Sequence, residues 1–263
     1  MTAPPAPSPR PPSAILEVNG LRVEFSGVHA VDGASFAVAP YTITGLIGPN
    51  GAGKSTTLGA VAGSLRPTGG RVRYDGQEVT GRPAHQLARE GLIRTFQLSS
   101  EFARLTVLEN LLVAAPAQRG ASVAGALLGR RWWRGQQEEL VERARSILAQ
   151  FELSVAADQY AGELSGGQKR LVEIMRALMA GPRVLLLDEP LAGVNPGLHA
   201  TVEEHLVRLR DEGMTMLMVE HELGAVERCC DSVIVMAQGR VLAEGSMAAH
   251  RANAEVVDAY LAG

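Results

Sequence analysis

Cysteine is scarce in this sequence of 263 residues, which contains only Cys229 and Cys230, side by side. Neighbouring cysteines rarely meet the geometry of a disulfide, and no CxxC spacing or histidine cluster accompanies this pair. We therefore predict two reduced thiols in a reducing compartment, without a local metal or redox site.

Positive charge is not in excess, and long apolar runs are missing. The formal net charge is −3, so the composition provides no basic field for nucleic acid, and we expect no nucleic-acid partner. No apolar run reaches the roughly 18 residues that a membrane span requires. The longest candidates, Val184–Leu187 and Met214–Val219, have the length of buried strands.

The first thirteen residues differ from the rest of the chain. They hold six of the fourteen prolines and lack the apolar segment of a secretory signal. We expect residues 1–13 to form an extended, disordered tail, with a ligand for a proline-binding partner as the weaker alternative. The chain as a whole is 46% hydrophobic and 20% charged, which is ordinary for a globular protein able to bury a core. Its 263 residues are enough for one large α/β domain or two small ones.

A phosphate-binding loop is predicted at residues 48–56. Its pattern G-x-x-x-x-G-K-[ST] is complete, and its candidate ligand residues are Gly48, Asn50, Gly51, Gly53, Lys54, Ser55 and Thr56. Glycines allow backbone N–H groups to point at one anion, and the following helix directs the positive end of its dipole toward it. A chance match is the alternative, but the flanks favour a strand over 42–47 and a helix over 56–65, as the motif requires.

Local patterns predict several further elements. Residues 15–25 indicate strands that meet at a turn on Asn19 and Gly20, and residues 71–79 indicate a hairpin around Asp75 and Gly76. Further strands are expected over 31–38 and 92–97, and a closing hairpin over 232–243 turns at Gln238 and Gly239. Helices are expected from Thr106, which can form a capping box with Glu109, over 136–148, and over the terminal 255–261.

A second anion site is predicted where a helix begins after Ser165. The hydroxyl of Ser165 can cap this helix, and the amides of Gly166 and Gly167 lie at its positive end, followed by Gln168. An ordinary cap before a buried helix is the alternative reading. The pairing with a phosphate loop favours the functional one.

Polar side chains follow two of the predicted buried strands. Asp188 and Glu189 end the apolar run that begins at Val184, and His221 follows the run that ends at Val219. Ligands of open α/β sheets bind beyond such strand ends. Asp188 suits Mg²⁺, Glu189 suits a general base, and His221 suits a contact with the γ-phosphate.

In this order the motifs resemble the nucleotide-binding subunits of ABC transporters. The resemblance covers about residues 15–263 and implies the α/β ABC ATPase fold. That fold has a P-loop NTPase core with an antiparallel β subdomain and an α-helical subdomain, here about residues 98–180 of a cassette spanning 14–263. It implies that Phe25 stacks on adenine, that Gln97 senses Mg²⁺ and the attacking water, and that Ser165, Gly166 and Gly167 reach the ATP held by a second copy. Ser55, Gln97 and Asp188 would be the metal-associated residues; Glu189, His221 and Gln97 would be the catalytic ones.

Finer features resemble the branched-chain amino acid importer ATPases. These are Arg94–Gln97, Leu105–Leu111, the turn Gly193–Pro196 and the ending Val256–Leu261, although Asn195 replaces the aspartate of the general ABC pattern. The resemblance implies ATP and Mg²⁺ as cofactors and a peripheral place at the cytoplasmic face of the membrane. The implied partners are transmembrane permease subunits, a second ATPase subunit (the same or a paralogue) and, indirectly, a solute-binding protein.

Alternatives remain open at this stage. The first alternative is a lipid or lipopolysaccharide exporter, whose cassettes are similar. The second is a soluble ABC ATPase, which usually carries two cassettes or a coiled coil, and this chain shows neither. The third is a non-hydrolysing regulator, which would not need all of Lys54, Asp188, Glu189 and His221. Trp132 and Trp133, beside three arginines, could dock a partner or lipid headgroups, or could anchor a helical hairpin.

Overall fold

The computed structural model describes residues 14–95, 102–116 and 130–251, together with residues 253, 256 and 258. The predicted proline-rich tail, Gln97, most of the expected terminal helix and the side chains of Trp132 and Trp133 lie outside the described residues.

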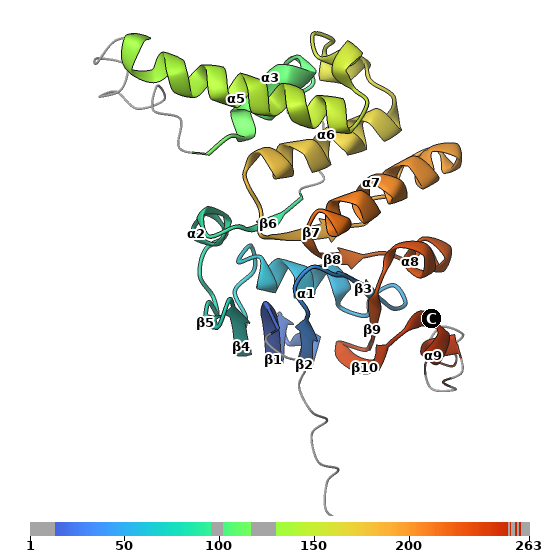
Figure 1. Cartoon of the computed structure of the whole chain (residues 1–263). Helices are drawn as coiled ribbons and strands as arrows, with labels where there is room; N and C mark the ends of the chain where they lie inside the picture. The colour runs from blue at the N-terminus through green and yellow to red at the C-terminus, as the bar shows by residue number, and fades with distance from the viewer. Residues whose placement is uncertain are drawn as a thin grey trace, which may run out of the picture.

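Among the described residues, six strands form the central sheet, in the order β10-β9-β3-β8-β7-β6, and all are parallel except β10 (Figure 1). They are β3 Ile43–Ile47, β6 Leu92–Arg94, β7 Val184–Asp188, β8 Thr215–Val219, β9 Ser232–Ala237 and β10 Arg240–Gly245. Every residue of β3, β7 and β8 is buried, as expected for parallel strands covered on both faces.

In the part of the chain that the structure describes, a second, antiparallel sheet has four strands, in the order β2-β1-β4-β5. They are β1 Leu16–Phe25, β2 Val28–Val38, β4 Gly69–Tyr74 and β5 Gln77–Glu78. The predicted turn at Asn19 and Gly20 is wrong. Gly20, with φ of 59°, lies within the single strand β1, where the pairing with both β2 and β4 shifts register. A bulge at this point lets β1 continue its hydrogen bonds with β2 on one side and β4 on the other. A turn would reverse the chain and break both sets of hydrogen bonds. The turn at Asp75 and Gly76 is confirmed, with φ of 49° and 74°.

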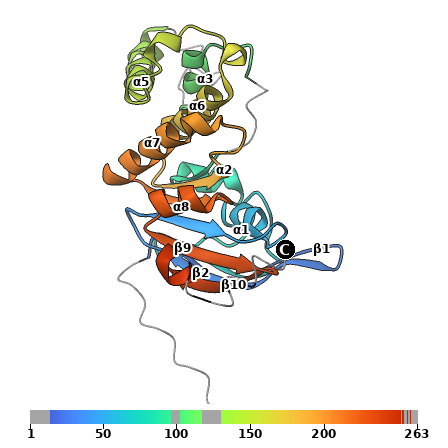
Figure 2. The same cartoon turned by 90° about the vertical axis from the view of Figure 1, so that its right-hand side faces the viewer.

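Helices cover the central sheet and extend beyond it (Figures 1 and 2). They are α1 Lys54–Val61, α2 Ala84–Arg89, α3 Val107–Ala114, α5 Arg130–Gln150, α6 Gly166–Met179, α7 His199–Asp211, α8 Leu223–Cys229 and α9 Met247–Arg251. Helix α1 ends before the predicted limit because Gly63, with φ of 71°, terminates it. The capping box of Thr106 and Glu109 is confirmed. Helices α3, α5 and α6 lie together at the end of the molecule opposite the antiparallel sheet.

Two large hydrophobic cores lie on opposite faces of the central sheet. Within β7, Leu185 and Leu187 join the core beneath α3 and α5–α8, whereas Val184 and Leu186 join the core shared with α1 and the antiparallel sheet. Strand alternation sends neighbouring side chains to opposite faces, so a continuous apolar run serves both cores. This double burial fixes the strand ends from which the candidate site is built.

Candidate functional site

Three neighbouring parallel strands deliver the predicted site residues to one edge of the sheet. The register pairs Leu46 of β3 with Val219 of β8, and Val219 with Asp188 of β7. The phosphate loop, the Asp188–Glu189 pair and His221 therefore leave the sheet side by side. This edge is where ligands of open α/β sheets bind.

The phosphate loop connects β3 to α1 with a backbone that requires glycine at two positions. Gly48 has φ of 150°, and a Cβ there would lie 2.1 Å from the carbonyl oxygen of Met236. Gly53 has φ of 95°, and its Cβ would lie 2.3 Å from the carbonyl oxygen of Ala30 in β2. Strands β9 and β2 therefore pack against the loop backbone, and the spacing of the motif reflects these contacts.

Lys54 is buried at the start of α1. Its Nζ donates to the carbonyl oxygens of Gly48 at 2.8 Å and Pro49 at 3.0 Å, so the ammonium group lies within the loop. Burial lowers the pKa of Lys54, while the nearby carboxylates of Glu189 and Asp188 act in the opposite direction. The cation is thus positioned to face a negatively charged ligand.

Two hard oxygen donors meet between α1 and β7. The hydroxyl of Ser55 lies 3.2 Å from Oδ1 of Asp188, while Nη2 of Arg94 lies 2.5 Å from Oδ2 of the same carboxylate. In the described ranges, no group of three or more His, Cys, Asp or Glu side chains could by itself enclose a metal ion. One hydroxyl and one carboxylate fit Mg²⁺, which typically takes few protein ligands and completes its shell with phosphate oxygens and water.

Glu189 follows β7 in an unusual backbone conformation. Its φ is 49°, rare for a residue with a side chain, and its N–H donates to the carbonyl oxygen of Val219 at 2.9 Å. Arg170, buried on α6, donates to the Glu189 carbonyl oxygen at 2.7 Å and also pairs with Glu173. The helix after Ser165 therefore fixes the backbone of Glu189 within the same chain.

His221 is exposed, whereas Glu220 before it is fully buried. Glu220 accepts hydrogen bonds from the backbone N–H groups of Leu191, at 3.0 Å, and His221, at 3.2 Å. Burial raises the pKa of Glu220, and these two hydrogen bonds oppose the shift. Glu220 thus links the turn after β7 to the loop after β8.

Ser165 caps α6 as predicted. Its hydroxyl accepts from the N–H of Gln168 at 3.3 Å, and the Gln168 side chain accepts from the Ser165 N–H at 3.0 Å. Gly166 and Gly167, the first two residues of α6, border the turn after β7. A Cβ on Gly166 would lie 2.9 Å from the Gly193 carbonyl oxygen, and one on Gly167 would lie 2.7 Å from the Leu198 side chain. Glycine therefore allows close packing of this loop on that turn.

Phe25 ends β1 with 48% of its surface exposed. Phe25 pairs with Val28 of β2 across the hairpin. Ala30, also in β2, contacts the phosphate loop at Gly53. The antiparallel sheet therefore joins this aromatic side chain to the loop through β2.

Sequence reasoning missed the roles of Arg94 and Arg170. Arg94 appeared only as part of a family match, and Arg170 lies within a helix that was read for its apolar face. A signal was present for Arg170, since a charged residue next to the buried stripe has Glu173 three positions later. Nothing local indicates that Arg94 contacts Asp188, because the pair is 94 positions apart.

Comparison with known proteins defines the class of this cassette. A family model described as ABC transporter matches residues 31–192, and the chain belongs to the ABC transporter family. It is therefore a nucleotide-binding, ATP-hydrolysing subunit of the transport ATPase class. In the part of the chain that the structure describes, no helix is both long and apolar enough to cross a bilayer.

Among curated relatives, the chain is similar to the high-affinity branched-chain amino acid transport ATP-binding protein BraF of Pseudomonas aeruginosa. The two are 40% identical over 94% of this chain and 97% of the relative. LivG of Escherichia coli, with the same descriptive name, is 38% identical over 94% and 97%.

Solved structures agree. A nucleotide-free ATP-binding cassette from an ABC transporter superposes with a TM-score of 0.83 at 38% identity, over 94% of this chain and 99% of that one. An ABC transporter cassette in its ADP conformation also gives 0.83, at 36% identity, over 96% of this chain and 100% of that one. The predicted fold and family are confirmed.

Proposed function

We propose that this chain is the ATPase subunit of an importer for branched-chain amino acids or related small polar solutes. The observation that supports the chemistry best is the convergence of the phosphate loop, the Ser55–Asp188 contact, Glu189 and the His221 loop at one sheet edge. The names of the 38–40% identical relatives support the solute class.

ATP binding would use the phosphate loop and the exposed aromatic side chain of β1. The loop amides and Lys54 would hold the β- and γ-phosphates, and Phe25 would stack on the adenine. The other loop residues that the proposal assigns to ATP are Gly48, Asn50, Gly51, Gly53, Ser55 and Thr56. The Lys54 ammonium would exchange its two carbonyl contacts for phosphate oxygens, a stronger charge-assisted interaction.

Ser55 and Asp188 would hold Mg²⁺ with the phosphate oxygens, and Gln97 is proposed as a further contributor. When bound, the ion offsets the negative charge that develops on the transferred phosphoryl group.

Hydrolysis would depend on Glu189 as the general base. The Glu189 carboxylate accepts a proton as water attacks the γ-phosphorus, the bond to the bridging oxygen breaks, and ADP leaves. His221 donates a hydrogen bond to the γ-phosphate, and Gln97 positions the water. Two hydrogen bonds of the Glu189 backbone support this role. Arg170 donates to the Glu189 carbonyl oxygen, and the Glu189 N–H donates to the Val219 carbonyl oxygen, so the turn that carries the base is constrained.

Two subunits would complete each ATP site. In this proposal Ser165, Gly166, Gly167 and Gln168 of one subunit reach the γ-phosphate held by the phosphate loop of the other. ATP would then favour a closed dimer and hydrolysis would release it. The cassette, with its helical subdomain at about 98–180, would bind permease subunits at the cytoplasmic face of the membrane, and a solute-binding protein would deliver the solute.

A Glu189→Gln variant tests the chemical part of the proposal. We expect phosphate release to fall by on the order of a hundredfold, because the amide cannot accept the proton. ATP binding should persist, and size-exclusion chromatography with ATP and Mg²⁺ should show more dimer than in the wild type. Glu204→Gln, which changes an exposed carboxylate on α7, is the matched control. Normal hydrolysis by Glu189→Gln would refute the assignment of the base.

A lipid or lipopolysaccharide exporter is the second candidate. Asn195 and the ending Tyr260–Leu261 favour import over export. The names of the relatives give branched-chain amino acids, not lipids, as what those proteins transport.

A further inference from the structure

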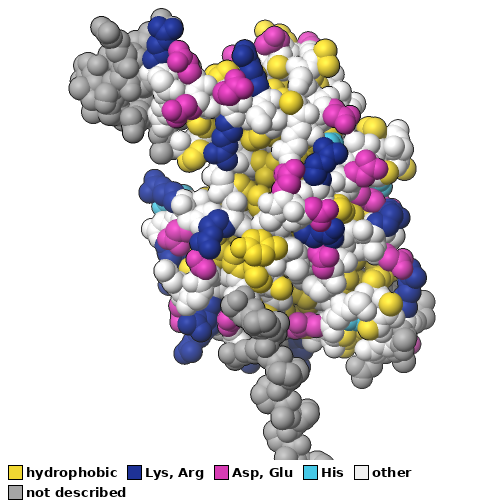
Figure 3. All heavy atoms as spheres, in the orientation of Figure 1, with side chains coloured by type: hydrophobic (Ala, Val, Ile, Leu, Met, Phe, Trp, Pro, Cys, Tyr) yellow, Lys and Arg dark blue, Asp and Glu magenta, His cyan; other side chains and the backbone are white. Residues whose placement is uncertain are grey.

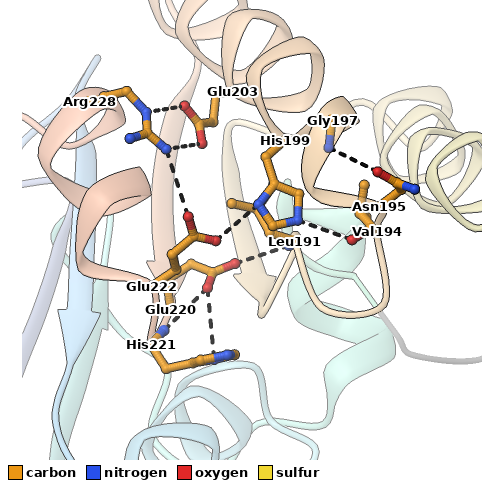
Figure 4. Close-up of polar contacts among 10 residues, drawn as sticks. All are labelled: Leu191, Val194, Asn195, Gly197, His199, Glu203, Glu220, His221, Glu222 and Arg228. Carbon is orange, nitrogen blue, oxygen red and sulfur yellow. Dashed lines mark hydrogen bonds and ion pairs between the residues drawn. The ribbon is translucent and has the colours of Figure 1, made fainter.

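His199 joins the turn after β7 to the loop after β8 (Figure 4). It is the first residue of α7. Its Nε2 lies 3.1 Å from the carbonyl oxygen of Val194, and its Nδ1 lies 3.0 Å from Oε2 of Glu222. These two acceptor atoms belong to the segments that follow β7 and β8, both at the proposed catalytic edge.

Both partners of the His199 ring are hydrogen-bond acceptors. Each ring nitrogen faces one of these acceptors and can donate a hydrogen bond to it when it carries a proton. The side chain is 17% exposed, so most of this bridge is shielded from competing water. One largely buried ring that contacts an acceptor in each of the two segments is a specific connection between them.

Each end of the bridge leads to residues that the proposed mechanism uses. Val194 lies in the turn against which Gly166 and Gly167 pack. Glu222 directly follows His221, and its other carboxylate oxygen lies 3.9 Å from Arg228. The His199 side chain therefore connects the turn beside the Ser165 loop to Glu222, the residue next to His221.

Glu222 is itself positioned by a second ion pair. Arg228 of α8 binds Glu203 of α7 through two hydrogen bonds, at 2.6 and 2.7 Å, and these raise the pKa of Arg228. The Glu203 carboxylate is 7% exposed. The bridge and this pair line a cleft of about 670 Å³ beside α7 and α8. Helix α7 thus carries His199 itself, while Arg228 of α8 lies beside Glu222.

We propose that His199 is a positioning residue for ATP hydrolysis. Through Val194 and Glu222 it sets the distance between the turn after β7 and the His221 loop, so that a shift of either segment is transmitted to the other. Glu220, which accepts from the Leu191 N–H, makes a second, buried connection between the same segments. The inference rests on the proposed roles of Glu189 and His221.

The test compares His199→Ala, His199→Gln, Glu222→Gln and the double variant His199→Ala with Glu222→Gln. We expect His199→Ala to lower kcat for phosphate release by roughly tenfold, since small displacements of catalytic groups are costly. The KM for ATP should change less than twofold, because the phosphate loop is untouched. His199→Gln, whose amide can still donate, should give an intermediate kcat. The double variant should lose no more than His199→Ala alone.

Controls separate this inference from a structural effect and from the proposed function. His85→Ala removes an exposed histidine on α2 and should leave kcat unchanged. Thermal unfolding of each variant shows whether the fold is retained. If Glu189→Gln is inactive but His199→Ala keeps wild-type kcat, or if the losses of the double variant multiply, the inference is wrong and the function stands. If wild-type hydrolysis does not depend on Glu189, the function itself is wrong.

Discussion

At the scale of single residues, Asp188 has two polar neighbours with opposite effects on the binding of a cation. The Ser55 hydroxyl contributes a second oxygen for a cation, whereas the Arg94 guanidinium already supplies a positive charge. Arg94 also donates to Ser64 at 3.1 Å, and its Nε is buried without a hydrogen-bond partner among the described residues. A cation that binds Asp188 must therefore compete with a largely buried arginine.

An Arg94→Met variant should bind Mg²⁺ more tightly in the presence of ATP. A hydrogen bond to a charged group contributes about 1.5 kcal/mol or more, so its removal should lower the half-saturating Mg²⁺ concentration about tenfold. Titration calorimetry, or electron paramagnetic resonance with Mn²⁺, measures this without relying on turnover. Arg183→Met, which breaks the exposed pair with Asp75, is the control. An unchanged midpoint in Arg94→Met would show that the arginine does not compete.

At the scale of elements, the end of β8 places a buried carboxylate between two loops. Because burial raises the pKa of Glu220 above its unfolded value near 4.5, the folded chain keeps a proton that the unfolded chain releases. The unfolded state then binds fewer protons, so this group makes stability fall as the pH rises from about 4.5 through the raised pKa.

Glu220→Gln should remove that contribution. Urea unfolding from pH 4 to 8 should show that the free energy of unfolding of the variant, relative to wild type, increases with pH across this window and then levels off. Glu204→Gln, exposed on α7, provides the comparison. A difference that is flat with pH, or that decreases, would contradict the raised pKa.

Elements with strong local signals could be predicted from the sequence. The buried strands β7 and β8 follow from uninterrupted apolar runs, and the caps at Thr106 and Ser165 follow from residue types three positions apart. The Asn19–Gly20 segment could not be predicted, because the same dipeptide serves a turn or a bulge, and pairing with β2 and β4 decides between them.

The candidate site was predictable to the extent that its motifs are local. Asp188, Glu189 and His221 could be predicted because each stands at or just after the end of an apolar run that forms a buried strand. The bridges made by Arg94, Arg170 and His199 depend on where distant segments pack, and no local pattern specifies those partners.

At the scale of the whole molecule, the proposed assembly requires surfaces for several partners at once. Acidic and basic side chains are interspersed over the face in Figure 3, without a single-sign field. Exposed apolar side chains of the helical end of the molecule, including Val113, Val155 and Tyr160, are 53%, 93% and 53% exposed. Specific docking to protein partners is therefore expected to depend on shape and apolar contact rather than on net charge.

Affinity purification from native membranes, with this chain as bait, tests the assembly. We expect two polytopic membrane proteins, a second ATPase and a solute-binding protein to co-purify, whose identity would define the solute. An unrelated soluble ATPase carrying the same tag is the control bait. Recovery of an exporter pair, or of ribosomes without membrane proteins, would refute import while leaving the ATPase chemistry intact.

The position of β3 in the sheet has a consequence for biosynthesis. Both of its neighbours, β8 and β9, come from the far end of the chain, and Thr44 meets Ser232 across 188 positions. At ordinary translation speeds that interval is on the order of ten to forty seconds. During this time β2 has already been made, but β8 and β9, between which β3 lies in the sheet, have not. A nascent chain therefore cannot form its nucleotide site until nearly all of the cassette has been made.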